Sequence, residues 1–158
     1  MGITTKGNGR VVFGPRIPPF INTYSMLFDG VDDYINVGNV VDKNKSTAFS
    51  ISIWVNIALT VSNNILISKV EDRDNGGALS KGGVGYQLYM NNQLYFRFLL
   101  DSHFSYQMYV RDGNYWGASQ GLNNGWHHIV GTYDGSGLSS GMTLYVDGYD
   151  VSFARVDT

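Results

Sequence analysis

Apolar side chains recur at every second position in several short segments of this chain, and this period constrains the fold more than any other feature. In 49–56 (FSISIWVN) apolar residues alternate with serine, tryptophan and asparagine. The stretch 86–98 (YQLYMNNQLYFRF) repeats the alternation on both sides of Asn91-Asn92, a pair that favours left-handed hairpin turns. Successive side chains of a β-strand point to opposite faces, so this period predicts strands that are buried on one face.

Further short strands are predicted in the rest of the chain. Residues 65–70 (ILISKV) are apolar, 103–111 (HFSYQMYVR) alternate, and 142–153 (MTLYVDGYDVSF) contain Asp147-Gly148, a strong hairpin signal. No segment has a sustained apolar stripe of helical period, so we expect an all-β fold of two packed antiparallel sheets. Polar or glycine-rich segments predict loops at 60–64, 71–85 and 112–124.

Residues 1–23 differ from the rest of the chain. They hold all three prolines, within FGPRIPPF, and proline cannot donate to a sheet ladder and favours extended backbone. We therefore expect an arm outside the main fold. It is either a disordered terminus or a docking arm that becomes ordered against a neighbouring subunit. The sandwich is expected to occupy residues 24–158.

The composition argues against several functional classes. A net charge of −2 without a run of like charges argues against a general nucleic-acid binder. No apolar run approaches the ~20 residues that a membrane-spanning helix needs, so membrane insertion is not expected. The chain has no cysteine, which excludes disulfides and thiolate chemistry. The first residues lack the apolar core of a secretory signal peptide.

Two of the three histidines are adjacent, in GWHHIVGTYDG at 125–135. In an extended strand His127 and His128 point to opposite faces, so they cannot converge on one metal ion. A zinc site also usually draws three or four clustered ligands. We expect structural roles, with one histidine half-buried beside a hydrogen-bond partner and the other nearer to solvent.

Four segments in order resemble laminin-G-like domains of the concanavalin A-like lectin/glucanase superfamily, of the type found in phage structural proteins. SMLFDGVDDYINVGN is similar to their opening strand-turn-strand, FSISIWVN to the next core strand, and GYQLYMNNQLYFRF to the central hairpin. GWHHIVGTYDG followed by MTLYVDGYDV is similar to their most recognisable segment. The resemblance covers residues 24–151 and implies a jelly-roll sandwich of two curved sheets.

Members of this family usually continue beyond the YVDG hairpin with strands that close both sheets. This sequence reaches only Thr158. We therefore expect a sandwich that is incomplete at its C-terminal side. Either the natural protein is longer, or a neighbouring chain completes the edge, because an open edge strand invites pairing.

The resemblance to glucanases raises the question of catalysis, since hydrolases on this fold use paired glutamates. Glycoside hydrolysis needs two carboxyl groups, about 5–5.5 Å apart for retention or roughly 6.5–9.5 Å apart for inversion. This chain has a single glutamate, Glu71, in the loop-like KVEDRDNG, and its aspartates cluster in turns. No nucleophile elbow or phosphate-binding loop is present. We expect no catalytic residues and no enzymatic activity.

The acidic turn DGVDD is the candidate metal site. Asp29, Asp32 and Asp33 offer the oxygen ligands that calcium takes, although calcium takes roughly six to eight of them. Laminin-G-like domains often hold calcium at a loop edge, so the resemblance supports the same residues. In the alternative interpretation, Asp29-Gly30 makes the turn and the other two acids are solvated. No other cofactor is expected.

Aromatic side chains opposite the core positions form the candidate ligand-binding set. Such rings can stack against a sugar or anchor a protein contact at low entropic cost. Tyrosine and tryptophan also favour strands irrespective of any ligand. Two members come from the glycine- and asparagine-rich loop NYWGASQGLNNG. The set comprises Trp54, Tyr89, Tyr95, Tyr109, Tyr115, Trp116 and Tyr145.

The arm, the missing signal peptide and the unfinished sandwich favour a non-enzymatic structural or adhesion module in a larger assembly, located in a phage virion. The arm would dock onto neighbouring subunits, and the sandwich would project as a decoration or receptor-contacting knob. The alternative is an extracellular carbohydrate-binding module that recognises cell-surface glycans. The expected partners are neighbouring protein subunits, with glycan as the alternative.

Overall fold

The computed structural model describes residues 23–38, 40, 43–57, 64–72, 83–99, 107–113, 122 and 125–158. The chain divides into two units, residues 1–38 and residues 39–158. The described part of the second unit contains nine strands and one short 3-10 helix, so the predicted all-β class is confirmed. No helix among the described residues is long and apolar enough to cross a membrane.

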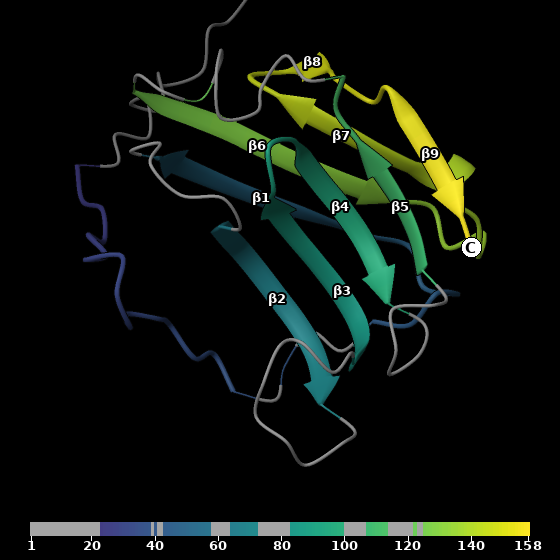
Figure 1. The fold of residues 1–158 in the computed structure, drawn as a ribbon, viewed down its shortest axis with the longest axis horizontal. Coiled ribbons are helices and arrows are strands. Elements are labelled where there is room, and N and C mark those ends of the chain that lie inside the picture. The colour runs from purple at the N-terminus through teal and green to yellow at the C-terminus, as the bar shows by residue number, and fades with distance from the viewer. Residues whose placement is uncertain are drawn as a thin grey trace, which may run out of the picture. The chain divides into compact units, whose positions relative to one another are not determined.

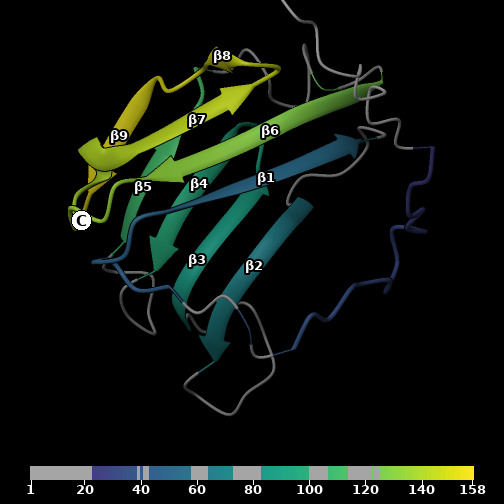
Figure 2. The ribbon, with the colours of Figure 1, turned by 180° about the vertical axis from the view of Figure 1, so that it is seen from behind.

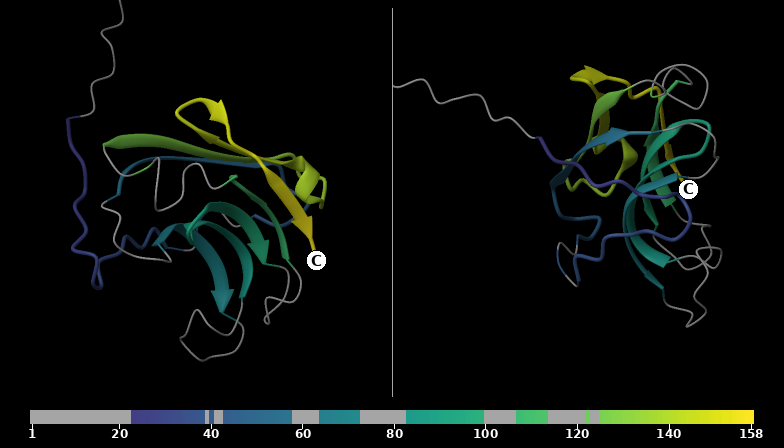
Figure 3. Two further views of the ribbon diagram at one scale, coloured as in Figure 1. Left: turned by 45° about the horizontal axis from the view of Figure 1, so that its top comes forward. Right: turned by 90° about the vertical axis from the view of Figure 1, so that its left-hand side faces the viewer.

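The nine strands form two antiparallel sheets that pack face to face (Figures 1, 2 and 3). The four-stranded sheet has the order β1 (Phe49–Asn56), β6 (Trp126–Tyr133), β7 (Met142–Val146) and β8 (Tyr149–Asp150). The five-stranded sheet has the order β2 (Asn64–Asp72), β3 (Gly83–Met90), β4 (Leu94–Leu99), β5 (Gln107–Arg111) and β9 (Ala154–Asp157). The helix η1 (Ser139–Gly141) directly precedes β7.

The core between the sheets follows the alternation of the sequence. In β4, Leu94, Phe96 and Phe98 are fully buried, whereas Tyr95 and Arg97 between them are half-buried and face outward. The inward side chains of β3, β5, β6 and β7 alternate in the same way. The buried cluster comprises Tyr86, Leu88, Met90, Leu94, Phe96, Phe98, Met108, Val110, Leu122, Ile129, Tyr133, Met142, Leu144 and Val146.

Burial is lower along β1, which is an edge strand of the four-stranded sheet. Its inward residues are half-buried, and Phe49 joins the aromatic part of the core through edge-on contacts with the rings of Phe96 and Phe98. Across β6, Gly131 lies against Phe96, where an added Cβ would be 3.0 Å from the ring. The glycine therefore allows β6 to pack closely over β4.

The strand β9 belongs to the five-stranded sheet, but its side chains bind the other layer. It pairs with β5, from Met108 opposite Asp157 to Arg111 opposite Ala154. The carboxylate of Asp157 accepts hydrogen bonds from the backbone N–H of Ser139 at 2.7 Å and from its hydroxyl at 2.9 Å. Arg155 Nε donates to the Met142 carbonyl at 3.0 Å. β9 thus connects β5 to η1 and to the start of β7.

The end of the chain differs from the predicted hairpin over 142–153. The Asp147-Gly148 turn is confirmed, with φ of 51° and 85°, but β8 ends at Asp150. The Leu144 carbonyl then accepts the N–H of Val151, and the Leu144 N–H donates to the Ser152 hydroxyl, which ends the ladder. The chain crosses to the other sheet as β9, a strand that the sequence pattern does not predict.

Other boundaries also differ from the expectation. The predicted loop 71–85 is too long, because β2 and β3 continue their pairing to Asp72 opposite Gly83, and Glu71 therefore lies in a strand. Backbone ladder bonds need no apolar side chains, so the apolar pattern missed these ends. The turn at Asn91-Asn92 is a three-residue loop that includes Gln93, and only Asn92 has a positive φ, of 56°.

The predicted strands of the opening segment 25–39 are wrong for the residues described, because 23–38 contain no strand. The predicted turn does form: Asp29 Oδ1 accepts the Val31 N–H at 2.8 Å, and Gly30 has a φ of 79°. An isolated two-stranded hairpin is marginally stable at best in water, so alternation and a turn signal alone do not suffice to form strands. Its large apolar side chains are exposed: Tyr24, Met26, Leu27, Phe28, Val31, Tyr34, Ile35 and Val37.

The predicted arm, residues 1–23, lies almost entirely outside the described residues, which begin at Thr23.

Candidate functional site

The structure divides the predicted aromatic set between the outward faces of the two sheets. Tyr89, Tyr95 and Tyr109 lie on the five-stranded sheet, in β3, β4 and β5. Trp54 and Tyr145 lie on the four-stranded sheet, in β1 and β7. The remaining two members, Tyr115 and Trp116, lie outside the described residues.

The first group forms what we call the tyrosine face, made of Gln87, Tyr89, Tyr95, Arg97 and Tyr109. Tyr89 is opposite Tyr95 in the β3–β4 ladder, and their rings stack with centroids 4.9 Å apart. The Tyr95 and Tyr109 rings lie 5.7 Å apart, with planes inclined by 60°. Three neighbouring strands therefore present one continuous row of phenol rings.

Arg97 lies within this row and is held by its neighbours. Its guanidinium lies 4.3 Å from the centroid of the Tyr89 ring. Its Nε and Nη2 donate to Gln87 Oε1 at 2.9 and 2.6 Å, and Gln87 Nε2 donates to Ser68 Oγ at 3.1 Å. Gln87 is only 3% exposed although it faces outward. These contacts fix the rotamers of Gln87 and Arg97.

Burial also shifts the pKa values of side chains on this face. It lowers the pKa of Arg97 from its ordinary value, although a guanidinium remains charged at neutral pH. Burial raises the pKa of Tyr89 and of Tyr95 above the ordinary phenol value. Both hydroxyls are therefore protonated at neutral pH and available as donors, and the Tyr95 hydroxyl donates to Gln93 Oε1 at 3.0 Å.

The second group lies in what we call the tryptophan face, made of Ser52, Trp54, Trp126 and His128. Trp54 is opposite His128 in the β1–β6 ladder, and the two rings stack at 4.9 Å with planes inclined by 19°. His128 Nε2 and Ser52 Oγ share a hydrogen bond of 2.8 Å. Trp54 is 61% exposed and Trp126 is 50% exposed.

Sequence reasoning missed three members of the tryptophan face, namely Ser52, Trp126 and His128. For His128 the sequence predicted only a structural role, on the face of the strand opposite to His127. The missing information was the pairing of β1 with β6, which sets Trp54 against His128. Tyr145 lies one strand further on, opposite Val130.

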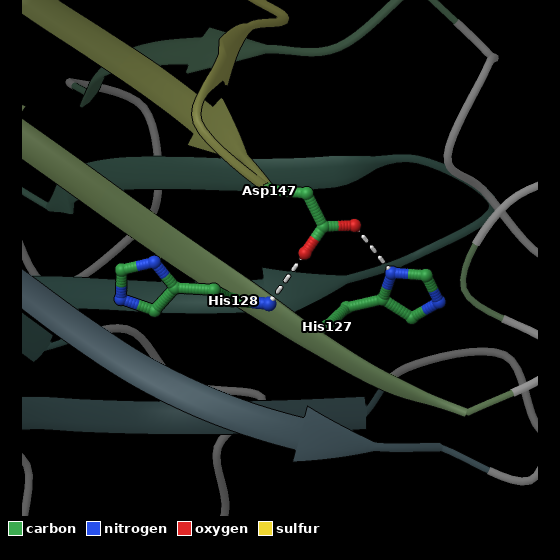
Figure 4. Close-up of polar contacts among 3 residues, drawn as sticks. All are labelled: His127, His128 and Asp147. Carbon is green, nitrogen blue, oxygen red and sulfur yellow. Dashed lines mark hydrogen bonds and ion pairs between the residues drawn. The ribbon is translucent and has the colours of Figure 1, made fainter. Parts of the chain in front are cut away.

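The adjacent histidines face opposite sides of β6, as predicted (Figure 4). His127 Nδ1 donates to Asp147 Oδ2 at 2.7 Å, and the backbone N–H of His128 donates to Asp147 Oδ1 at 2.9 Å. The hydrogen bond from the His128 backbone, aided by the one from His127, lowers the pKa of Asp147. Both histidines therefore have partners within the sheet, and they form no shared metal site.

The predicted calcium ligands Asp29, Asp32 and Asp33 do come together, with one carboxylate oxygen of each within 4.8 Å of the others. All three are exposed. Asp29 Oδ1 accepts the Val31 N–H at 2.8 Å, and Asp33 Oδ2 accepts the Asp29 N–H at 2.9 Å. Their oxygens are of the type that calcium prefers, but these side chains alone do not fill the roughly six to eight positions of its coordination shell. The hydrogen bonds of the turn account for the positions of two of them.

The chain matches one protein family, described as the concanavalin A-like lectin/glucanases superfamily, over residues 29–156. The match includes the acidic turn, both aromatic faces, β1 to β8 and most of β9. No curated protein and no solved structure matches the chain. Two antiparallel sheets in face-to-face packing agree with the fold of this family. The chain therefore belongs to the concanavalin A-like lectin/glucanases superfamily.

Proposed function

We propose that this chain is a non-enzymatic adhesion module that binds carbohydrate on the tyrosine face. Membership of the superfamily supports a carbohydrate-binding or adhesion-type module in general. The observation that carries the proposal is the row of Tyr89, Tyr95 and Tyr109 on three neighbouring strands, with Arg97 held between them.

The chemistry of this face suits a sugar. A phenol ring offers an apolar surface to the C–H groups of a pyranose, and its hydroxyl offers a hydrogen bond. Arginine adds donors in a fixed planar array, which hydroxyl or carboxylate oxygens of a saccharide accept. Because Gln87 already fixes Arg97, a ligand would order fewer side chains on binding, and this lowers the entropic cost.

The same face supports a binding role over a hydrolytic one. The outward positions of β3, β4 and β5 that the structure describes carry no carboxylate. Glycoside hydrolysis requires two such groups about 5 to 10 Å apart. The described outward residues of these strands are Gly85, Gln87, Tyr89, Tyr95, Arg97, Leu99, Gln107, Tyr109 and Arg111.

A glycan array tests the proposal, with the Tyr109→Ala variant and its matched control Tyr109→Phe. We expect selective binding by the native chain, a loss of roughly tenfold or more in Tyr109→Ala, and retention in Tyr109→Phe, since the ring supplies the stacking surface. Circular dichroism confirms that each variant is folded. A silent array, or full binding by Tyr109→Ala, would contradict a carbohydrate site on this face.

We propose as a second function that the chain docks into a larger assembly, with neighbouring subunits of a phage virion as its partners. The observation that favours it is the group of exposed apolar side chains in 23–38, among them Leu27 at 95% exposure and Tyr34 at 80%. Clustered exposed apolar residues mark interaction sites. In this role the virion is the location, whereas a free glycan-binding module would act outside the cell.

Size-exclusion chromatography with light scattering tests the docking role. We expect the native chain to self-associate or to co-elute with particle components, and a Leu27→Ser/Tyr34→Ser double variant to remain monomeric. The matched control is Tyr149→Ser, which removes an exposed aromatic residue from β8 instead. Docking through this segment would be contradicted if the native chain is monomeric and a variant that lacks residues 23–38 still incorporates into particles.

A further inference from the structure

We infer that the tryptophan face is a second carbohydrate site, which takes a neutral sugar chain and is separate from the tyrosine face. It lies on the other sheet and does not depend on the function proposed for the tyrosine face. Three properties of the described residues lead to this inference: two exposed indoles on one face, a polar edge beside them, and the absence of charged side chains from the outward positions of β1, β6 and β7.

The first property is the position of the indoles. Trp126 is opposite Asn56, and Trp54 is opposite His128, so the two tryptophans are diagonal neighbours on adjacent strands and on the same face. Diagonal neighbours have Cβ atoms roughly 7–8 Å apart, within reach of large side chains. Trp54 is 61% exposed and Trp126 is 50% exposed, whereas tryptophan side chains are highly buried on average. Large exposed aromatic side chains grouped in this way are characteristic of a binding surface.

The second property is the arrangement of polar groups beside the rings. His128 stacks against the ring of Trp54, and its Nε2 shares a hydrogen bond of 2.8 Å with Ser52 Oγ. This contact orients the imidazole and supports the Trp54 ring. A saccharide stacked on the indoles would meet hydroxyl, imidazole and amide groups at its edge, from Ser52, His128 and Asn56.

The third property is charge. None of the outward positions of β1, β6 and β7 carries an aspartate, glutamate, lysine or arginine. An anionic or cationic partner would find no complementary charge on these strands, whereas a neutral polyhydroxylated ligand needs none. The outward face of β3, β4 and β5 differs, because it carries Arg97 and Arg111. The outward residues here are Ser50, Ser52, Trp54, Asn56, Trp126, His128, Val130, Thr132, Thr143 and Tyr145.

Isothermal titration calorimetry with neutral hexasaccharides, namely cellohexaose, laminarihexaose and maltohexaose, tests the inference on the full chain. We expect at least one of them to bind, and Trp54→Ala and Trp126→Ala each to weaken that binding roughly tenfold. The matched control, Tyr149→Ala, removes an exposed ring that belongs to neither aromatic face and is expected to leave this binding unchanged. Trp54→Phe, which keeps a smaller ring, is expected to lose less than Trp54→Ala.

A second measurement needs no destabilising variant. In the native chain, the indole N–H signals of Trp54 and Trp126 should shift during an NMR titration with the same hexasaccharide. The inference is overturned if none of the three sugars binds, or if binding is lost in Tyr109→Ala and kept in Trp54→Ala. The latter result would leave the tyrosine face as the carbohydrate site, so the two proposals fail separately.

Discussion

Two Asp-Gly turns in this molecule have nearly the same local geometry and very different surroundings. Asp29 Oδ1 accepts the Val31 N–H at 2.8 Å, with Gly30 at a φ of 79°. Asp134 Oδ1 accepts the Ser136 N–H at 2.8 Å, with Gly135 at a φ of 82°. The first turn lies in a segment without strands, whereas the second directly follows β6.

The difference between the two lies in what flanks the turn. The inward residues of β6 are held between β1 and β7 in one sheet and face the other sheet, so Ile129 and Tyr133 are buried. The residues on both sides of Gly30 are as apolar as these residues of β6, but Leu27 and Val31 are exposed. A short-range Asp-Gly signal therefore fixes the turn itself, and a neighbouring strand decides whether the flanking residues become a sheet.

The largest difference in stability between the two regions is expected when one leucine in each region is replaced by alanine. Leu144→Ala removes a fully buried side chain from β7, and we expect it to lower the free energy of unfolding by about 2–5 kcal/mol. Leu27→Ala removes an exposed one, and we expect a change within about 0.5 kcal/mol. Urea denaturation in dilute solution measures both. Equal losses would show that 23–38 are packed in solution, and the comparison would fail.

A smaller effect is expected from the glycines of the two turns. An added Cβ at Gly135 would lie 2.8 Å from the backbone nitrogen of Ala48, whereas at Gly30 nothing lies within 4 Å. Both positions have positive φ, which strains an L-residue. We expect Gly135→Ala to destabilise the sandwich by about 1–3 kcal/mol and Gly30→Ala to leave its melting temperature unchanged. Similar shifts for both in thermal denaturation would mean that the second unit does not unfold independently of residue 30.

The third prediction concerns the turn at Asp147, whose carboxylate binds the neighbouring strand β6. Because hydrogen bonds from His128 and His127 lower its folded pKa below 3.8, Asp147 stabilises the fold above that pH and loses this effect as the pH falls through the folded pKa. We expect Asp147→Asn, which tolerates the positive φ, to make stability less dependent on pH below about pH 4. Urea midpoints between about pH 5 and pH 2 measure this.

The control for this experiment is Asp29→Asn in the unpaired turn. It should leave the acid side of the stability curve unchanged, because the hydrogen bonds of Asp29 are local to its turn and join it to Asp33 and Val31. If the urea midpoints of the native chain and of Asp147→Asn fall in parallel as the pH is lowered, a stabilising role of the Asp147 carboxylate is contradicted.

The smallest effect is expected from calcium. The turn interpretation of Asp29, Asp32 and Asp33 predicts that millimolar calcium leaves the melting temperature and the NMR signals of 23–38 unchanged. A saturable shift of these signals, absent in Asp32→Asn, would instead show that the acidic turn binds the ion.

Much of the second unit could be predicted from the sequence, because its inward residues alternate over whole strands. Phe96 and Leu144 are buried where the alternation places them, and the turn at Asp147-Gly148 forms where its residues predict it. These features depend on side-chain period and on turn chemistry, which are local properties. The residues of β9 lack such a signal, and their place is set by bonds to Ser139 and Met142 in other elements.

The candidate sites were less predictable, because they depend on which strands pair. The five aromatic residues of the set that lie in strands were predicted to face away from the core, but period alone does not say which sheet a strand joins. Ser52 and His128 are 76 residues apart and meet only through the β1–β6 ladder. The hydrogen bonds from Arg97 to Gln87 likewise depend on the register of β3 with β4, which brings these two side chains opposite each other.

The attachment of β9 to both layers has a mechanical consequence. A pulling force applied to Asp157 would reach β5 through the backbone ladder and η1 through the Ser139 bonds at the same time. Tension would thus be shared between the sheets instead of peeling one strand from its neighbour. Such load sharing would help a surface module that is anchored through its last strand to withstand shear.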